Sequence, residues 1–316
     1  IPLMIQLFIT IPPSHRMILP ILKFLRGIIS IELVDEIEDN IEKVSVKLDQ
    51  VIHNTNDEKC HIEILKIYKL FCSKYLDNDF LNEKMTTVIF STCLQELQLS
   101  KTATGFNSKI VINTYEVIKT LTRIIRQLSA DQMMELMKYI ANDISLTQEE
   151  LVQLEDDPEE FVKNEIESDL YSVRKSAGEL LNNIRRVRED TLTIVNQCIQ
   201  SIQSSNNENA IRLFIGLVVE GENPRLGATR IPNGVSIANF WSTSVKQSLF
   251  STPQITTIKF VCTFRSQLGV SPDEYDSIFA QLMNIAICPN VKGKELACSM
   301  LSANTVEKML LLNTSK

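Results

Sequence analysis

Residues that interrupt regular structure are scarce in this chain. It has nine glycines and ten prolines in 316 residues, and nothing in it resembles the apolar–polar alternation of a β-strand. This scarcity argues against an all-β or loop-rich fold. Apolar side chains recur instead at spacings of three and four, as in Val173, Ala177 and Leu180. Such a stripe is typical of the buried face of an amphipathic helix.

Motifs for catalysis and metal binding are also missing. The sequence has three histidines and contains no Gly-rich phosphate loop, no G-x-S-x-G and no H-E-x-x-H. Cys60, His61 and Cys72 come closest to metal-ligand spacing, but no fourth ligand is evident. The carboxylates of residues 155–160 lack the spacing and central glycine of a calcium loop. The sequence therefore predicts no enzyme, no cofactor and no metal site, and it is typical of a binding scaffold.

Charge and cysteine content narrow the class of partner. The net charge is −7, which argues against nucleic acid as the main partner because binding its backbone needs clustered Lys and Arg. A basic protein partner is the more natural one. The seven cysteines include no C-x-x-C pair. They are expected to be reduced thiols of a cytosolic or nuclear protein.

The N-terminal region is apolar but too short to span a membrane. The chain begins with Ile1 rather than Met, so we expect it to be a fragment of a longer protein. The first apolar run ends at Pro12 and Pro13 and has no basic leader, which argues against a membrane span and a signal peptide. The apolar residues 17–31 are interrupted by charges. Both runs are expected to be buried helices.

The apolar stripes and the breaks between them predict a series of helices joined by short connections. We expect helices near residues 17–32, 34–53, 57–76, 78–98, 107–127, 129–144, 158–167, 170–186, 187–204, 206–220, 235–250, 254–268, 271–287 and 291–312. Helix pairs that repeat roughly every 40 residues favour an all-α, HEAT-repeat-like α-solenoid, a right-handed superhelix of antiparallel helix pairs. Residues 1–316 would form one continuous fragment of such a solenoid, with about seven helix pairs. A globular helical bundle is the structural alternative.

Two longer connections, 143–158 and 221–234, are predicted to be loops. In a solenoid, such insertions project from one face and often contact partners. The first contains the run Glu155-Asp156-Asp157-Pro158-Glu159-Glu160. Pro158 suits the first position of a helix, with Asp157 as its N-cap. Good capping chemistry alone is one interpretation of this run, and a partner-binding surface is the other.

Four stretches resemble, in order, motifs of the importin-β superfamily. They are Val34–Glu42, Leu154–Phe161 with Ser168–Leu181, Asn209–Leu213 and Ile258–Gln267. The closest resemblance is to the CAS-type exportins that return importin-α to the cytoplasm, and it extends over about residues 34–305. One departure is Val173-Arg174-Lys175, where that family has three arginines. Lys does not reproduce the bidentate fork of Arg.

The resemblance implies the middle portion of a karyopherin, a HEAT-repeat nuclear transport receptor that is not an enzyme. Such a receptor binds importin-α together with the GTP form of the small GTPase Ran in the nucleus and releases it in the cytoplasm. It passes the FG-repeat proteins of the nuclear pore, so the expected location is the nucleus, the cytoplasm and the nuclear envelope. Neither nucleic acid binding nor membrane insertion is implied.

The resemblance also assigns candidate binding residues. It places a repeat insertion at residues 146–169. This insertion would lie close to Ran and cargo and act as a hinge. The expected Ran- or importin-α-binding residues are an acidic lip and two basic neighbours, namely Glu155, Asp156, Asp157, Glu159 and Glu160, with Arg174 and Lys175. For the two basic residues, a solvated helix face or an internal salt bridge to the acidic run is an equal alternative.

Other functions also fit this sequence. An importin of the same superfamily would release its cargo when it binds RanGTP, whereas an exportin binds its cargo together with RanGTP. A HEAT-repeat scaffold unrelated to transport would not bind Ran in either nucleotide state. An enzyme with an unrecognised site is the remaining alternative, and the motif search argues against it.

Overall fold

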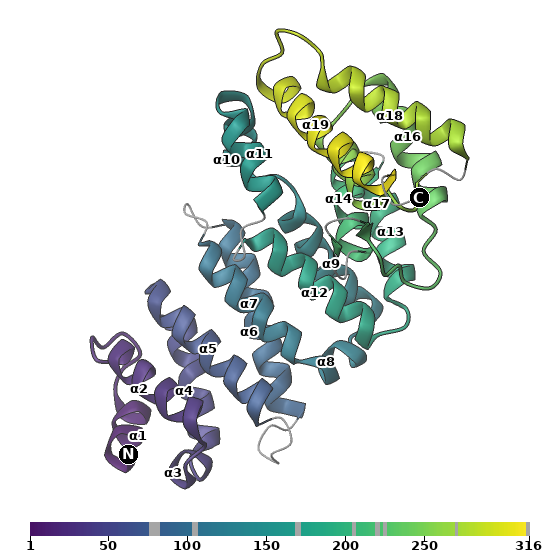
Figure 1. Cartoon of the computed structure of the whole chain (residues 1–316). Coiled ribbons are helices and arrows are strands. Elements are labelled where there is room, and N and C mark those ends of the chain that lie inside the picture. Colours follow the sequence, from purple (N-terminus) through teal and green to yellow (C-terminus); the bar gives the residue numbers. More distant parts are fainter. Residues whose placement is uncertain are drawn as a thin grey trace. The chain divides into compact units, whose positions relative to one another are not determined.

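The computed structural model describes most of the chain as helices (Figure 1). The described residues are 1–75, 83–102, 107–167, 172–203, 207–218, 222–223, 226–268 and 271–313. The chain divides into two compact units, Ile1–Leu136 and Met137–Lys316. The all-α prediction is confirmed.

The first unit is built around its fifth helix. Its helices are α1 (Pro2–Thr10), α2 (Ile18–Ile31), α3 (Asp35–Glu38), α4 (Ile41–Asn54), α5 (Glu58–Lys74), α6 (Glu83–Thr102), α7 (Ser108–Thr120), α8 (Thr122–Gln127) and the start of α9 (Ala130–Ile144). α5 contacts α2, α4 and α7, and α7 contacts α6. The buried rings of Tyr68 and Phe71 fill this layer. Contact with the next helix pair along the chain is the packing pattern of a solenoid.

The second unit contains a row of four stacked helices. Its elements are α10 (Gln148–Asp156), α11 (Pro158–Glu167), α12 (Val173–Val187), α13 (Thr191–Gln203), α14 (Asn207–Val218), β1 (Glu222–Asn223), β2 (Gly227–Ala228), α15 (Ile237–Phe240), the π-helical turn η1 (Trp241–Val245), α16 (Lys246–Ser251), α17 (Ile255–Phe264), α18 (Pro272–Ala286) and α19 (Gly293–Asn313). α12 contacts α14, α14 contacts α17, and α17 contacts α19. We call these four helices the α12–α14–α17–α19 row.

The predicted loop at 143–158 is wrong, because α10 occupies most of it. The side chain of Thr147 accepts a hydrogen bond from the Glu150 amide at 3.1 Å, and the Glu150 carboxylate accepts one from the Thr147 amide at 2.7 Å. This capping box starts a helix in a stretch with few apolar residues. The predicted start of the next helix is confirmed, because α11 begins at Pro158 and Asp157 Oδ1 accepts from the Glu160 amide at 3.2 Å.

Three other segments that were expected to be continuous helices contain an irregular turn. The helix expected over 34–53 is interrupted between α3 and α4, where Asn40 Nδ2 donates to the Glu36 carbonyl at 2.9 Å. The helix expected over 107–127 is interrupted at Leu121. The helix expected over 235–250 contains the π-helical turn η1. In each case the apolar stripe continues across an irregular turn, so periodicity does not reveal the break.

The loop predicted at 221–234 holds the short antiparallel pair β1–β2. Gly227 has a φ of 79°, and a Cβ added there would lie 2.2 Å from the Thr263 carbonyl oxygen. Glycine is therefore required where β2 crosses the end of α17. Parts of both expected insertions, residues 168–169 in the first and 221 and 224–225 in the second, lie outside the described residues.

The single tryptophan is a packing residue. Trp241 lies in η1 with its ring centroid 6.4 Å from that of Phe260. Its Nε1 donates to the Glu274 carboxylate at 3.0 Å. The ring thus fixes the connection between α15 and α16 against α17.

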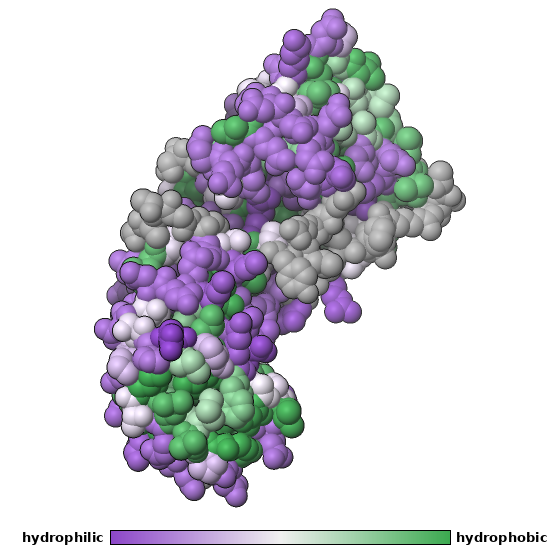
Figure 2. Space-filling view, turned by 90° about the vertical axis from the view of Figure 1, so that its left-hand side faces the viewer, coloured by the Kyte–Doolittle hydropathy of each residue, from purple (hydrophilic) through white to green (hydrophobic). Residues whose placement is uncertain are grey.

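Exposed apolar side chains gather on the N-terminal helices. Leu3 and Leu7 of α1 and Phe24 and Ile31 of α2 are exposed, and Figure 2 shows an apolar patch at the lower end of the molecule, where Figure 1 places these helices. Among the described residues, none of the helices is both long and apolar enough to cross a membrane. All seven cysteines are free thiols, and burial raises the pKa of Cys60 and of Cys72 to about 12.

Candidate functional site

The acidic lip forms the exposed turn of a helical hairpin made by α10 and α11. All five of its carboxylates are exposed. Both helices of the hairpin contact α19, and the Glu155 carboxylate lies against Gly293 at the start of that helix. Glu160 and Lys163 form an exposed pair at 3.6 Å. Except at these contacts and at the Asp157 cap, the lip presents negative charge to solvent.

One carboxylate of the same hairpin is buried. The side chain of Glu165 on α11 is 4% exposed. Its Oε2 accepts from Lys259 Nζ at 2.5 Å, its Oε1 accepts from Arg174, and Arg212 Nη1 lies 3.6 Å away. Burial raises the Glu165 pKa, but the positive charges of Lys259, Arg212 and Arg174 outweigh it and hold the pKa well below its usual range. Glu165 is therefore ionised and anchors the hairpin.

The three cations come from three helices of the α12–α14–α17–α19 row. Arg174 belongs to α12, Arg212 to α14 and Lys259 to α17. Each lies in one of the stretches that carry the family resemblance, namely Ser168–Leu181, Asn209–Leu213 and Ile258–Gln267. The fold thus brings three separate motifs to one carboxylate. Of these four charged residues, sequence reasoning singled out Arg174 alone. The shared motifs were the signal that could have pointed to Arg212 and Lys259.

Arg174 is largely buried, with a side chain that is 23% exposed. Besides Glu165, it donates from Nη2 to Glu150 Oε1 at 2.5 Å. Its salt bridges are therefore internal, but they go to α10 and α11 rather than to the acidic lip. Lys175 is half-buried and lines a cleft of about 490 Å³ with Arg174 and Lys259. A partner contact by Arg174 or Lys175 stays a prediction.

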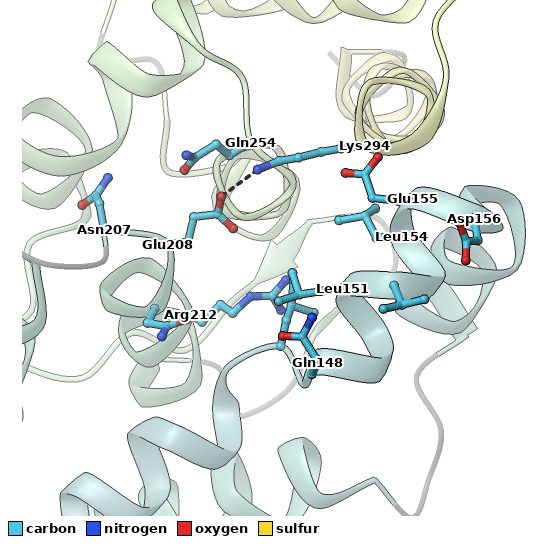
Figure 3. Close-up of a pocket in the computed structure, with 13 residues that line it drawn as sticks. Gln148, Leu151, Leu154, Glu155, Asp156, Asn207, Glu208, Arg212, Gln254 and Lys294 are labelled. Carbon is cyan, nitrogen blue, oxygen red and sulfur yellow. Dashed lines mark hydrogen bonds and ion pairs between the residues drawn. The ribbon is translucent and has the colours of Figure 1, made fainter.

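A larger cleft, of about 810 Å³, lies between α10 and the first residues of α14 and α19 (Figure 3). Glu208 and Lys294 face each other across it at 3.0 Å. Its α10 wall carries Leu151 and Leu154 together with Glu155 and Asp156 of the acidic lip. Within the described ranges, no group of three or more His, Cys, Asp or Glu side chains is arranged to hold a metal ion.

These features define the class of protein. Stacked helix pairs, a hairpin held by buried charge and an exposed acidic turn make a helical scaffold with an acidic surface. The residues match the Cse1 family over 35–291. The chain belongs to the Cse1 family, and it is a CAS-type exportin-like member of the importin-β superfamily.

Two curated relatives and one solved structure support this assignment. The chain is 28% identical over 157 residues to the importin-alpha re-exporter of Schizosaccharomyces pombe, which is 44% of this chain and 16% of the relative. It is 23% identical over 194 residues to the importin alpha re-exporter of Saccharomyces cerevisiae, which is 56% of this chain and 20% of the relative. The chain therefore spans a small part of the length of these relatives.

The solved structure is that of the exportin Cse1 in its cargo-free, cytoplasmic state. It superposes with a TM-score of 0.71 at 17% identity, over 99% of this chain and 38% of that chain. At this identity the match shows the fold, and it confirms the predicted HEAT-repeat-like α-solenoid.

Proposed function

We propose that the chain is part of a nuclear export receptor that binds importin-α together with RanGTP and releases it in the cytoplasm. The observation that carries this proposal is the match of residues 35–291 to the Cse1 family. The two curated relatives, which are named importin-alpha re-exporters, support it. The receptor shuttles through the nuclear envelope, contacts the FG-repeat proteins of the pore and catalyses no reaction itself.

The acidic lip is our proposed contact for a basic surface of Ran or importin-α. Its carboxylates are exposed while Glu165, on the same hairpin, is buried among three cations. The hairpin is thus anchored at Glu165, and its turn is accessible. Exposed charge of one sign attracts a partner of the opposite sign and raises the association rate.

The direction of transport is tested by a pull-down. The protein, expressed from its complete open reading frame, is incubated with immobilised importin-α in the presence of RanGTP or RanGDP. Retention with RanGTP alone supports export. Expulsion by RanGTP indicates an importin, and absence of Ran binding in both states indicates a static scaffold.

The lip is tested by neutralising it without removing its caps. We substitute Asp156→Asn, Glu159→Gln and Glu160→Gln and keep Asp157, because it caps α11. Assembly with importin-α and RanGTP should weaken several-fold, with the circular dichroism spectrum unchanged.

The matched control removes the same charge elsewhere on the second unit. Its three exposed substitutions are Glu189→Gln, Asp276→Asn and Glu307→Gln. If the control weakens assembly as much as the lip variant does, net charge explains the effect. If neither variant weakens it, the lip is a helix cap without a binding role.

A further inference from the structure

Arg212 is a buried arginine whose charge is incompletely paired. The residue is 4% exposed, and its Nη2 has no hydrogen-bond partner. Its nearest carboxylate oxygen, Glu165 Oε1, lies 3.6 Å away, which is too far for a hydrogen bond. That carboxylate already accepts from Lys259 and Arg174. Burying a donor without an acceptor is unfavourable, so this arrangement leaves Arg212 able to gain from an anion.

The local charge balance favours such an anion. Arg174, Arg212 and Lys259 share two carboxylates, those of Glu150 and Glu165. Glu208 is also near Arg212, but it is paired with a lysine of α19. One positive charge of the cluster is therefore uncompensated, and it lies on the wall of the 810 Å³ cleft.

One helix end adds to this positive potential. The cleft is lined by the first three residues of α14, by the N-cap Gln254 of α17 and by the second residue of α19. The amino-terminal end of a helix carries partial positive charge. α17 has no acidic residue in its first turn to offset it. The first turns of α14 and α19 carry Glu208 and Glu295, so the amino-terminal end of α17 is the helix end that adds to the positive charge of Arg212.

The opposite wall is partly accessible. It is formed by the apolar residues Leu146, Leu151, Val152 and Leu154, and the carboxylates of Glu155 and Asp156 line the cleft at the end of α10. Leu151 and Val152 are 41% and 51% exposed. Figure 3 shows the Arg212 side chain reaching toward Leu151 and Gln148 of α10. The exposed part of this wall is thus formed by Leu151 and Val152.

We propose that this cleft binds an acidic side chain next to an apolar one, carried on an extended segment of a protein partner. Arg212 receives the carboxylate, and the apolar wall of α10 receives the neighbouring side chain. This specificity is opposite in charge to that of the acidic lip. The hairpin then separates two kinds of ligand, with basic groups at its turn and acidic groups in the cleft beneath it.

The test uses the full chain with ¹³C-labelled Leu and Val methyl groups. The probe is the hexapeptide acetyl-Ala-Leu-Glu-Leu-Asp-Ala-amide, and its neutral control replaces Glu with Gln and Asp with Asn. The methyl signals of Leu151, Val152 and Leu154 should shift with the acidic peptide. The neutral peptide should bind about tenfold more weakly, as expected for the loss of a charge-assisted hydrogen bond.

Two variants and one control locate the binding. Leu151→Asp should abolish the shifts at Val152 and Leu154, because it places negative charge on the exposed wall. Ile287→Asp, which changes an exposed residue of the same unit that does not line the cleft, should leave binding unchanged. Arg212→Lys keeps the buried charge and should weaken binding several-fold.

Three results would overturn the proposal: equal affinity for both peptides, no methyl shift at millimolar peptide, or undiminished binding by the Leu151→Asp variant. Each can be read without Ran or importin-α, so failure here leaves the export proposal intact.

Discussion

The two units use charge differently. In the first unit, Glu63 pairs with Arg26 at 2.6 Å and with Lys66 at 3.1 Å, and both cations are 39% exposed. Lys69 and Glu116 join α5 to α7 in the same manner, at 2.8 Å. The cations of these pairs lie at the rim of helices that already share an apolar layer, although the Glu63 side chain itself is 8% exposed. In the second unit, Glu165 is buried and joins the α10–α11 hairpin to three helices of the row. A hairpin with a polar sequence is thus held by buried charge where it has little apolar surface to bury.

The largest expected effect comes from removing that charge. Glu165→Gln leaves three cations without their common carboxylate, and loss of one partner of a buried ion pair typically costs about 3–5 kcal/mol. We expect faster hydrogen exchange in α11 and α12, measured by mass spectrometry, and unchanged exchange in α2 and α5 of the first unit.

Glu160→Gln is the matched control, on the same helix but in an exposed pair. Exposed pairs contribute about 0–1 kcal/mol, so exchange should stay close to that of the unsubstituted protein. If both variants behave alike, the buried cluster does not anchor the hairpin.

A smaller effect is expected in the first unit, and it depends on pH. His61 is buried, with Nδ1 2.8 Å from the Glu96 carboxylate and Nε2 2.8 Å from the Thr55 carbonyl oxygen. Both partners accept hydrogen bonds, so the ring carries two protons. Burial lowers the His61 pKa, but these hydrogen bonds and the charges of Glu96 and Asp57 outweigh it, so the net shift is upward.

The sign of the pH dependence follows from that raised pKa. The stabilisation is fully present below the unfolded value of about 6.5 and is lost as the pH rises through the folded pKa. A hydrogen bond to a charged group contributes about 1.5–3 kcal/mol. Hydrogen exchange of α5, corrected for its intrinsic pH dependence, should therefore report lower stability at alkaline pH. An equal pH dependence in the His61→Gln variant would contradict this assignment.

A third effect distinguishes the geometry of the buried cluster from its charge. Arg174 donates to carboxylates of both hairpin helices, Glu150 on α10 and Glu165 on α11. Arg174→Lys keeps the charge but cannot reproduce the fork. We expect a loss of about 1.5 kcal/mol in the free energy of unfolding, the lower end of the range for one hydrogen bond to a charged group. Adding Glu150→Gln to this variant should lower the free energy of unfolding little further, because the lysine no longer spans both helices. If the losses from the two substitutions are fully additive in urea denaturation, Arg174 does not bridge the two helices.

The sequence was sufficient for the helices and for one cap. Apolar spacing located most helices within a few residues, and Pro158 with its preceding aspartate marked the start of α11. α10 was missed because its evidence is a capping box rather than an apolar stripe. The buried cluster was not predicted from local sequence patterns, for a different reason. Glu165 and Lys259 are 94 residues apart, and no local sequence pattern indicates that two such distant charges will be buried together.

The smallest expected effect lies within the acidic lip itself and compares two adjacent aspartates. Asp157 caps α11 through its Oδ1, whereas Asp156 is an exposed residue at the end of α10. Asp157→Ala should lower the free energy of unfolding by about 1 kcal/mol, because one amide of the first turn loses its acceptor. Asp156→Ala should change it by less than about 0.5 kcal/mol, as is usual for a surface position. Urea denaturation of the two variants separates capping from surface charge. Equal losses would mean that the hairpin turn is stabilised by its overall charge and not by the cap.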